Sequence, residues 1–178
     1  KRGWPYLAQV LSILISILVT SDRGYAADPV VIDPSKTSLG VITGGDAGEG
    51  LDLTGNFIYA LSFGADPANS WQIHDALFKG ILTDEVPGAL LTAQNRIENW
   101  YIVDYGDSAD DDSLEAATSS IRWSAAPEVV TLSLDGILVG GQYKLQLIFG
   151  EECCNRGFDV LIDGNVVVDD FNPGNQHG

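Results

Sequence analysis

The clearest pattern along the chain is an alternation of apolar and polar side chains in two stretches. Between Tyr143 and Phe149, leucine and aromatic residues alternate with Lys144 and Gln146, which is typical of a strand with one buried face. The same period of two runs through Phe57–Phe63 (FIYALSF). Both stretches are therefore predicted to be strands.

A β-hairpin is predicted in the last part of the chain. Phe158–Ile162 and Val166–Asp170 flank the dipeptide Asp163-Gly164. This dipeptide suits a type I′ turn, because both central positions of that turn require a positive φ. Further strands are expected at Trp100–Tyr105, Ile121–Ser124 and Val129–Leu134.

Together these segments predict an all-β fold. Many short strands between glycine-rich turns indicate a β-sandwich or jelly roll, and the chain shows no internal repeat and no amphipathic helix of convincing length. Residues 28–52 are rich in Gly, Asp, Ser and Thr and are expected to form a linker or an irregular lead-in. The sandwich is expected over residues 53–178, with helix as a minor component.

Residues 1–27 are expected to be a signal peptide that precedes the fold. Lys1 and Arg2 come before the apolar run Leu7–Val19, and small residues follow at Ala26 and Ala27. A basic start, a short apolar run and a small-residue cleavage site are typical of a secretory signal, whereas a membrane-spanning helix needs about 20 apolar residues. We expect a signal-peptide helix, cleavage after Ala26 or Ala27, no membrane insertion afterwards, and a secreted, cell-surface or periplasmic protein.

The length of 178 residues fits one domain and is too short for two of ordinary size. The chain opens at Lys1 and ends in a polar run at Gly178 without a closing strand. We therefore expect a piece of a longer protein. The sandwich would then be incomplete at its C-terminal end, and its partners would include other domains of the same chain.

The charge balance narrows the range of partners. The chain carries 25 Asp and Glu against 9 Lys and Arg, a formal net charge of −16. A surface this acidic repels phosphate backbones and anionic lipid headgroups. Nucleic acid and membrane surfaces are thus excluded as expected partners, and the charge itself is expected to keep an extracellular protein soluble.

Several spaced motifs in the second half of the chain match those of a known family. They are Gly141 with Tyr143, Phe149–Glu151, Phe158–Val160, Gly164 and Val167–Phe171, together with the upstream strand Ile58–Gly64 and the pair Arg122-Trp123. From Leu53 to its end the chain resembles the malectin and malectin-like domains. The resemblance implies a jelly-roll β-sandwich of the galactose-binding-like type, which binds glucose-type oligosaccharides or serves as an accessory module of a secreted protein.

The chain departs from the family at the sugar site. In malectin, two adjacent aromatic residues after the F-A-E turn stack on the sugar, and here those positions are Cys153 and Cys154. An exported protein favours disulfides, but adjacent cysteines close only a strained ring. Three interpretations stay open: a vicinal disulfide that forms an apolar plate, bonds to cysteines outside this chain, or free thiols. Glu152, beside them, is a candidate to hydrogen-bond a ligand hydroxyl.

Other candidate sugar-contacting residues lie in turn-prone segments. Sugar recognition needs an aromatic plate for the apolar face of the ring and planar polar groups for its hydroxyls. Trp71 and His74 stand in a polar stretch, and Trp123 stands beside Arg122 and Ser124. Each tryptophan is interpreted either as an exposed ring for a sugar or as a ring that covers the sandwich edge, since Trp is rarely fully buried.

The acidic segment 106–113 (GDSADDDS) is expected to be a loop. Asp107, Asp110, Asp111 and Asp112 offer the oxygen ligands that calcium prefers, so a structural calcium ion is one interpretation and a solvated run of charges is the other. The spacing does not fit an EF-hand. No other cofactor is implied, because Cys and His are too few for a zinc site.

No catalytic motif is present. The neighbouring carboxylates Glu151 and Glu152 diverge on one strand, while glycoside hydrolysis needs two facing carboxyls about 5 to 9 Å apart. His74-Asp75 has no placed nucleophile. The leading hypothesis is a secreted, non-catalytic carbohydrate-binding module with a glycan as its partner. The alternatives are a structural or adhesive β-sandwich without a sugar site, and an accessory domain of a secreted glycoside hydrolase.

Overall fold

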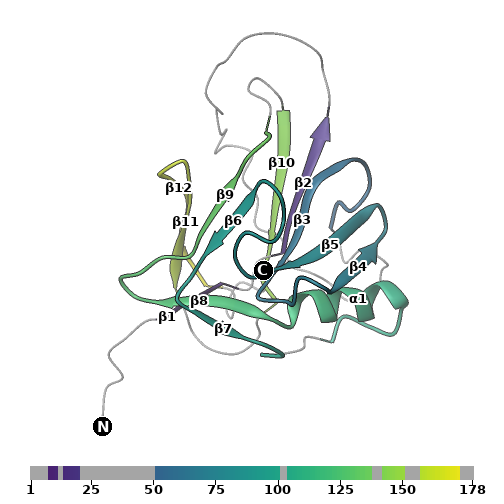
Figure 1. Ribbon diagram of the computed structural model, residues 1–178, viewed down its shortest axis with the longest axis horizontal. Coiled ribbons are helices and arrows are strands. Elements are labelled where there is room, and N and C mark those ends of the chain that lie inside the picture. The colour runs from purple at the N-terminus through teal and green to yellow at the C-terminus, as the bar shows by residue number, and fades with distance from the viewer. Residues whose placement is uncertain are drawn as a thin grey trace.

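The computed structural model describes residues 8–11, 14–20, 51–100, 104–137, 142–150 and 157–172. Within these ranges the protein is mostly β, with several small sheets and one α-helix (Figure 1). The prediction of an all-β protein with little helix is therefore confirmed at this level.

The largest sheet has five strands and positions the candidate site. In spatial order its strands are β10 (Gln142–Ile148), β2 (Leu14–Thr20), β3 (Phe57–Phe63), β5 (Ala76–Ile81) and β4 (Ser70–Ile73). All neighbouring pairs are antiparallel except β3 and β5, which run parallel. The two strands predicted from alternation, β3 and β10, are thus confirmed.

The remaining strands form three smaller sheets. They consist of β1 (Ala8–Leu11), β8 (Ile121–Ala125) and β7 (Asn95–Ile97); of β6 (Ala89–Thr92) and β9 (Thr131–Leu134); and of β11 (Phe158–Ile162) and β12 (Asn165–Phe171). The hairpin β11–β12 turns at Asp163 and Gly164, with φ of 50° and 77°. Both values are positive, as the type I′ prediction requires.

One face of the five-stranded sheet carries the larger apolar core. The odd positions of β3, Tyr59, Leu61 and Phe63, are buried there because a strand directs alternate side chains to opposite faces. Ile81 of β5 joins them, and the small sheets contribute Ala89, Leu91, Phe158 and Phe171. Phe149, Phe158 and Phe171 pack ring against ring, with centroids 4.8 to 5.4 Å apart.

The opposite face of the sheet lies under the helix α1 (Ala109–Thr118). Ala60, Ile73 and Phe78 are buried against Leu114 and Ala117 of the helix. The acidic segment expected to be a loop is therefore the start of a helix. The negative charge of this segment suits the start of a helix, because carboxylates in the first turn interact favourably with the positive end of the helix dipole.

The N-terminal apolar run is not helical in this structure. Its described parts form β1 and β2, and β2 lies between β3 and β10. A short run of Leu, Ile and Val suits a buried strand as well as a helix, and periodicity alone does not separate the two. Export and cleavage stay predictions, as does the boundary at residue 27.

Two other predicted strands differ in extent. Of Trp100–Tyr105, residues 101–103 lie outside the described residues, and Trp100 and Tyr105 belong to no strand. The strand expected at Val129–Leu134 begins only at Thr131. Val129 is instead exposed, and its carbonyl accepts a hydrogen bond from the Ser124 hydroxyl at 3.1 Å. This bond holds Val129 outside the β6–β9 ladder.

Candidate functional site

A groove opens where β3 and β5 separate. The two strands pair only from Leu61 to Phe63 with Lys79 to Ile81, and in Figure 1 their ribbons spread apart toward their N-terminal ends. Upstream of the paired part lies a cleft of about 380 Å³, here called the β3–β5 groove. Its lining consists of residues 55–61, Asp75, Leu77, Lys79, Val86 and Pro87.

A β-bulge shapes the floor of the β3–β5 groove. Tyr59 pairs with Ile17 and Phe57 pairs with Leu18, so Ile58 is an extra residue on β3. A bulge re-aims the side chains around it, and here Phe57 packs against the core under α1 while Ile58 keeps 36% of its surface exposed. Ile58 is therefore a partly exposed apolar residue in the lining of the groove.

The opposite wall of the β3–β5 groove is built by β5. Ala76 and Phe78 are buried under α1, so Leu77 and Lys79 point to the other face of the strand. Leu77 is 45% exposed, which is high for a leucine within a sheet. Ile58 and Leu77 are thus the exposed large apolar residues of the lining.

Hydrogen bonds hold the polar part of the groove in place. The Asp75 carboxylate accepts from the backbone N–H of Gly55 at 2.8 Å, and the Asp75 N–H donates to the Leu53 carbonyl at 3.0 Å. The Tyr59 hydroxyl donates to the Asp135 carbonyl at 2.8 Å, and burial raises the pKa of Tyr59. One carboxylate oxygen of Asp75 thus accepts the hydrogen bond from Gly55, and Asp75 is one of the residues that line the groove.

The groove places apolar and polar residues side by side. The volume falls in the range of small-molecule pockets, which combine apolar walls with a few placed polar groups. Asp75 is the sole carboxylate side chain in the lining formed by the described residues. Glycoside hydrolysis uses two, so the groove does not present the pair needed for that reaction.

Trp71 and His74, both predicted from sequence, lie near each other but outside the groove lining. Trp71 is half-buried on β4 and packs against the core under α1. His74 occupies the β4–β5 turn with a φ of 49°, and its Nε2 lies 3.5 Å from Asp110 Oδ2. The structure thus brings His74, which was predicted to contact the sugar, next to Asp110, which was predicted to bind calcium.

Trp123 belongs to a different sheet from Trp71. It lies on β8, half-buried, and its indole N–H is buried without a hydrogen bond to the part of the chain that the structure describes. The neighbouring Arg122 is buried and donates to the carbonyls of Leu82 and Ala93, the latter at 2.8 Å. Arg122 therefore ties the segment around β6 to β8. The remaining predicted sugar contacts, Glu152, Cys153 and Cys154, lie outside the described residues.

The four aspartates considered for calcium are placed by α1. Asp110, Asp111 and Asp112 occupy its first turn, and Asp107 precedes it. Asp111 is buried, and its Oδ2 accepts from the Ser108 N–H at 2.8 Å, so this carboxylate takes part in capping. Successive positions on a helix point about 100° apart, which directs these side chains to different sides.

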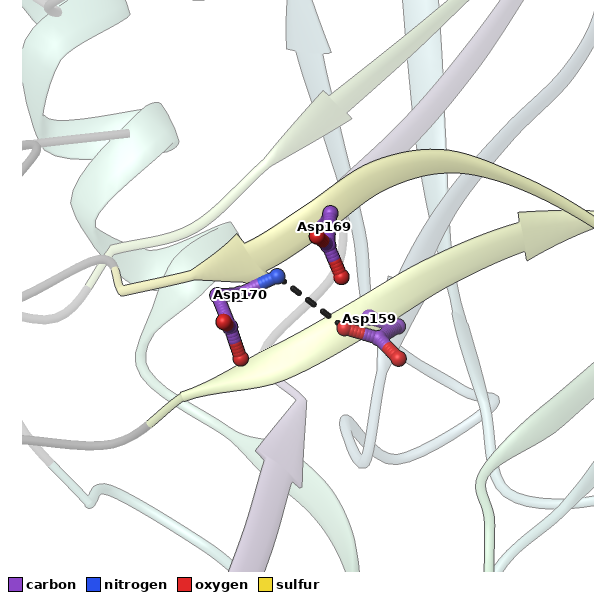
Figure 2. Close-up of side chains that lie close together, drawn as sticks. All are labelled: Asp159, Asp169 and Asp170. Carbon is purple, nitrogen blue, oxygen red and sulfur yellow. Dashed lines mark hydrogen bonds between the residues drawn. The ribbon is translucent and has the colours of Figure 1, made fainter.

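A cluster of three aspartates that we did not predict lies on the hairpin β11–β12 (Figure 2). Oxygens of Asp159, Asp169 and Asp170 lie within 4.8 Å of one another, and the Asp170 N–H donates to Asp159 Oδ1 at 3.0 Å. The charges of Asp159 and Asp170 raise the pKa of Asp169. One oxygen from each of the three carboxylates supplies fewer ligands than the 6 to 8 that calcium takes, so water would have to complete such a site.

The register of the hairpin explains why this cluster was missed. Counting outward from the two-residue turn places Asp159 opposite Val168, and three carboxylates would not meet. In the structure Val160 pairs with Val168 and Phe158 with Phe171, because one register shift lies on each side of Val160. The one signal in the sequence was the adjacent pair Asp169-Asp170, which lies on β12, the strand that pairs with the strand of Asp159.

Comparisons with protein families, with curated proteins and with solved structures give no match for this chain. No helix among the described residues is long and apolar enough to cross a membrane. The site must therefore be interpreted from its own geometry.

Proposed function

We propose that this protein is a secreted, non-catalytic carbohydrate-binding module of the malectin-like, jelly-roll type, and that the β3–β5 groove holds the sugar. The observation that carries the proposal is the groove itself, a cleft of about 380 Å³ whose lining combines exposed apolar residues with polar groups. Its partner would be a glycan, presented to a domain of a larger extracellular protein.

The two kinds of surface match the two kinds of surface on a sugar ring. Ile58 and Leu77 are exposed apolar side chains that would contact the C–H face of the ring. Asn56 and Asp75 stand in the same lining and would accept or donate hydrogen bonds to hydroxyls. Tyr59 supports the floor, because its hydroxyl is already bound to Asp135.

A structural β-sandwich without a sugar site is the second candidate. It is favoured by the placement of Trp71 and Trp123, which are half-buried and lie in different sheets. Trp71 lies on the edge strand β4 and Trp123 on the central strand β8 of another sheet, so the two rings do not share one sheet face. An accessory role beside a glycoside hydrolase is compatible with either candidate.

A glycan array followed by calorimetry tests the proposal. We expect binding of an oligosaccharide that Leu77→Ala weakens about tenfold, equivalent to about 1.4 kcal/mol. Leu161→Ala is the matched control, because Leu161 is 53% exposed on β11 and does not line the groove. Trp71→Ala and Trp123→Ala, measured in parallel, report whether the predicted tryptophans contribute.

The outcomes separate the two candidates. Loss of binding with Leu77→Ala and not with Leu161→Ala supports the groove as the sugar site. A folded wild-type protein that binds no glycan, with or without calcium, overturns the proposal and favours the structural role.

A further inference from the structure

The strand β2 occupies an interior position of the five-stranded sheet. It lies between β3 and β10, and its purple arrow runs between their ribbons in Figure 1. Leu14–Thr20 pairs with β10 along its whole length, and Leu14–Leu18 pairs with β3. β2 therefore joins two strands that are not neighbours in the sheet.

The same segment belongs to the predicted signal peptide. Cleavage after Ala26 or Ala27 would remove β2, and the backbone groups of β3 and β10 that bond to it would lose their partners. Unpaired backbone groups inside a sheet are costly, and a row of them is a template for another strand. Cleavage would therefore open a strand-sized gap between β3 and β10, here called the β2 slot.

Contacts that do not involve β2 hold β10 in place. The Gln146 side chain accepts from the Asp52 N–H at 2.9 Å and donates to the Asp52 carbonyl at 2.7 Å. Tyr143 and Leu147 pack against the larger apolar core, and Ile148 is buried in the core under α1. These contacts keep β10 beside the segment that leads into β3, so we expect the β2 slot to persist after cleavage.

Both faces of the sheet are covered beside the β2 slot. On β3, Leu61 is buried in the larger core, and Ala60 is buried in the core under α1. A strand that is covered on both faces is a nearly continuous apolar run and does not alternate. Leu14–Thr20 (LISILVT) is such a run and contains no charged residue. Because an unpaired charge is very costly to bury, the β2 slot fits only an uncharged strand that is apolar on both faces.

The mature chain does not offer a second strand of this kind. The strands from β3 to β12 are all paired in sheets, and no segment outside the described strands has an uncharged apolar run as long as Leu14–Thr20. A second copy of the mature chain would bring the same lack of a spare strand and the same strongly negative charge, which repels it. The donor must therefore be another polypeptide.

We propose that cleavage of the leader turns the β2 slot into a docking site for a partner protein, which inserts an uncharged apolar strand antiparallel to both β3 and β10. This is recognition by strand addition, with the added strand inside the sheet and not at its edge. The inference rests on the predicted removal of the leader and is independent of the β3–β5 groove.

A peptide with the sequence of Leu14–Thr20, flanked by lysines for solubility, is the probe, and the exported protein is the receptor. We expect binding in calorimetry and a midpoint of thermal unfolding that rises with peptide concentration, because a ligand of the folded state alone stabilises it. The full chain, produced without export so that it keeps its leader, should bind the peptide at least about tenfold more weakly. The tethered β2 competes there at a high effective concentration.

Two altered peptides are the matched controls. Ile17→Lys places a charge in the strand, and Ser16→Pro removes a backbone donor without changing the charge. Each should bind at least about tenfold more weakly than the unaltered peptide. Both keep the flanking lysines, so a general attraction to the acidic surface would leave them bound.

Hydrogen exchange locates the bound peptide. Insertion into the β2 slot should protect backbone amides of both β3 and β10, whereas addition at an outer edge of the sheet would protect only β10 or only β4. Protection of an edge strand alone, or equal binding of the three peptides, overturns the proposal. It also fails if the folded, exported protein does not bind the peptide or still contains residues 14–20. The glycan array decides the sugar-binding proposal separately.

Discussion

Ser108 and Asp111 cap the N-terminus of α1 reciprocally. The Ser108 Oγ accepts from the Asp111 N–H at 3.1 Å, and Asp111 Oδ2 accepts from the Ser108 N–H at 2.8 Å. This capping box satisfies two backbone donors that a helix start would leave unpaired. It fixes where α1 begins, and therefore where Asp110 approaches His74 in the β4–β5 turn.

Removal of this cap is expected to destabilise the protein. Ser108→Ala should lower the free energy of unfolding by about 1 kcal/mol, because the Asp111 N–H loses its acceptor. Ser113→Ala is the control, since Ser113 lies inside the same helix and its hydroxyl only bonds back to the Ala109 carbonyl. Urea unfolding measures both, and an equal effect of the two substitutions would contradict the capping role.

Gly64 is expected to be intolerant of a side chain for two reasons. Its φ is +87°, and an added Cβ would lie 2.6 Å from the Ile121 carbonyl oxygen. The left-handed backbone costs about 1 kcal/mol for alanine and the contact about 2 kcal/mol more. Gly64→Ala should therefore destabilise by about 3 kcal/mol.

Gly164→Ala separates these two effects. Gly164 has a similar φ of +77° but open space around its Cβ position, so only the cost of about 1 kcal/mol is expected. If thermal unfolding shows the same loss for both glycines, the close approach of β8 to Gly64 is not the cause.

Arg122 is expected to be the most costly polar residue to replace. Arg122→Gln should lower the free energy of unfolding by about 3 kcal/mol, because the carbonyls of Leu82 and Ala93 lose charge-assisted donors in a buried place. Lys144→Gln removes an exposed ion pair with Asp52 and should cost less than about 1 kcal/mol. Comparable losses in urea unfolding would show that Arg122 does not anchor the β6 segment.

The aspartate cluster predicts a pH dependence of stability. Asp169 has a pKa raised above its ordinary value of 3.8, chiefly by the Asp159 charge. The folded protein therefore holds this proton more tightly than the unfolded chain, and the associated stabilisation is present below that value and lost as the pH rises through the raised pKa. Asp169→Asn should be more stable than wild type at neutral pH and lose this advantage at low pH.

Thermal unfolding from about pH 3 to about pH 7 measures the effect. Asp104→Asn serves as the control, because it removes the same charge from an exposed position outside the hairpin. A pH profile of Asp169→Asn that runs parallel to wild type would contradict the proposed repulsion.

The N-terminal segment gives a direct test of export. Cleavage after Ala26 or Ala27 would remove β1 and β2, yet the segment before β3 is tied to β10 without them. The Gln146 side chain accepts from the Asp52 N–H at 2.9 Å and donates to the Asp52 carbonyl at 2.7 Å. We expect the secreted protein to begin at Ala27 or Asp28 by N-terminal sequencing, and the chain from Asp28 to unfold cooperatively. Loss of cooperative unfolding in that chain would make β2 an essential strand.

Local patterns in the sequence were sufficient for several strands. The alternation in Phe57–Phe63 and Tyr143–Phe149 reports which face of a strand is buried, and Asp163-Gly164 reports a tight turn, because both depend on residues close together in the chain. The same reasoning missed α1. Its acidic first turn resembles a solvated loop until the Ser108–Asp111 cap and the burial of Leu114 are seen.

The sites depended on contacts between distant segments. The β3–β5 groove exists because the parallel strands β3 and β5 pair only where Leu61–Phe63 meets Lys79–Ile81. The bulge at Ile58 leaves the side chain of that residue partly exposed. The aspartate cluster exists because two register shifts move Asp170 toward Asp159. Sequence by itself determined the strand character of β3, β10 and the β11–β12 hairpin, through side-chain period and turn chemistry. Only the tertiary structure decided which strands are neighbours and in what register, because pairing energy comes from partners far apart in the chain.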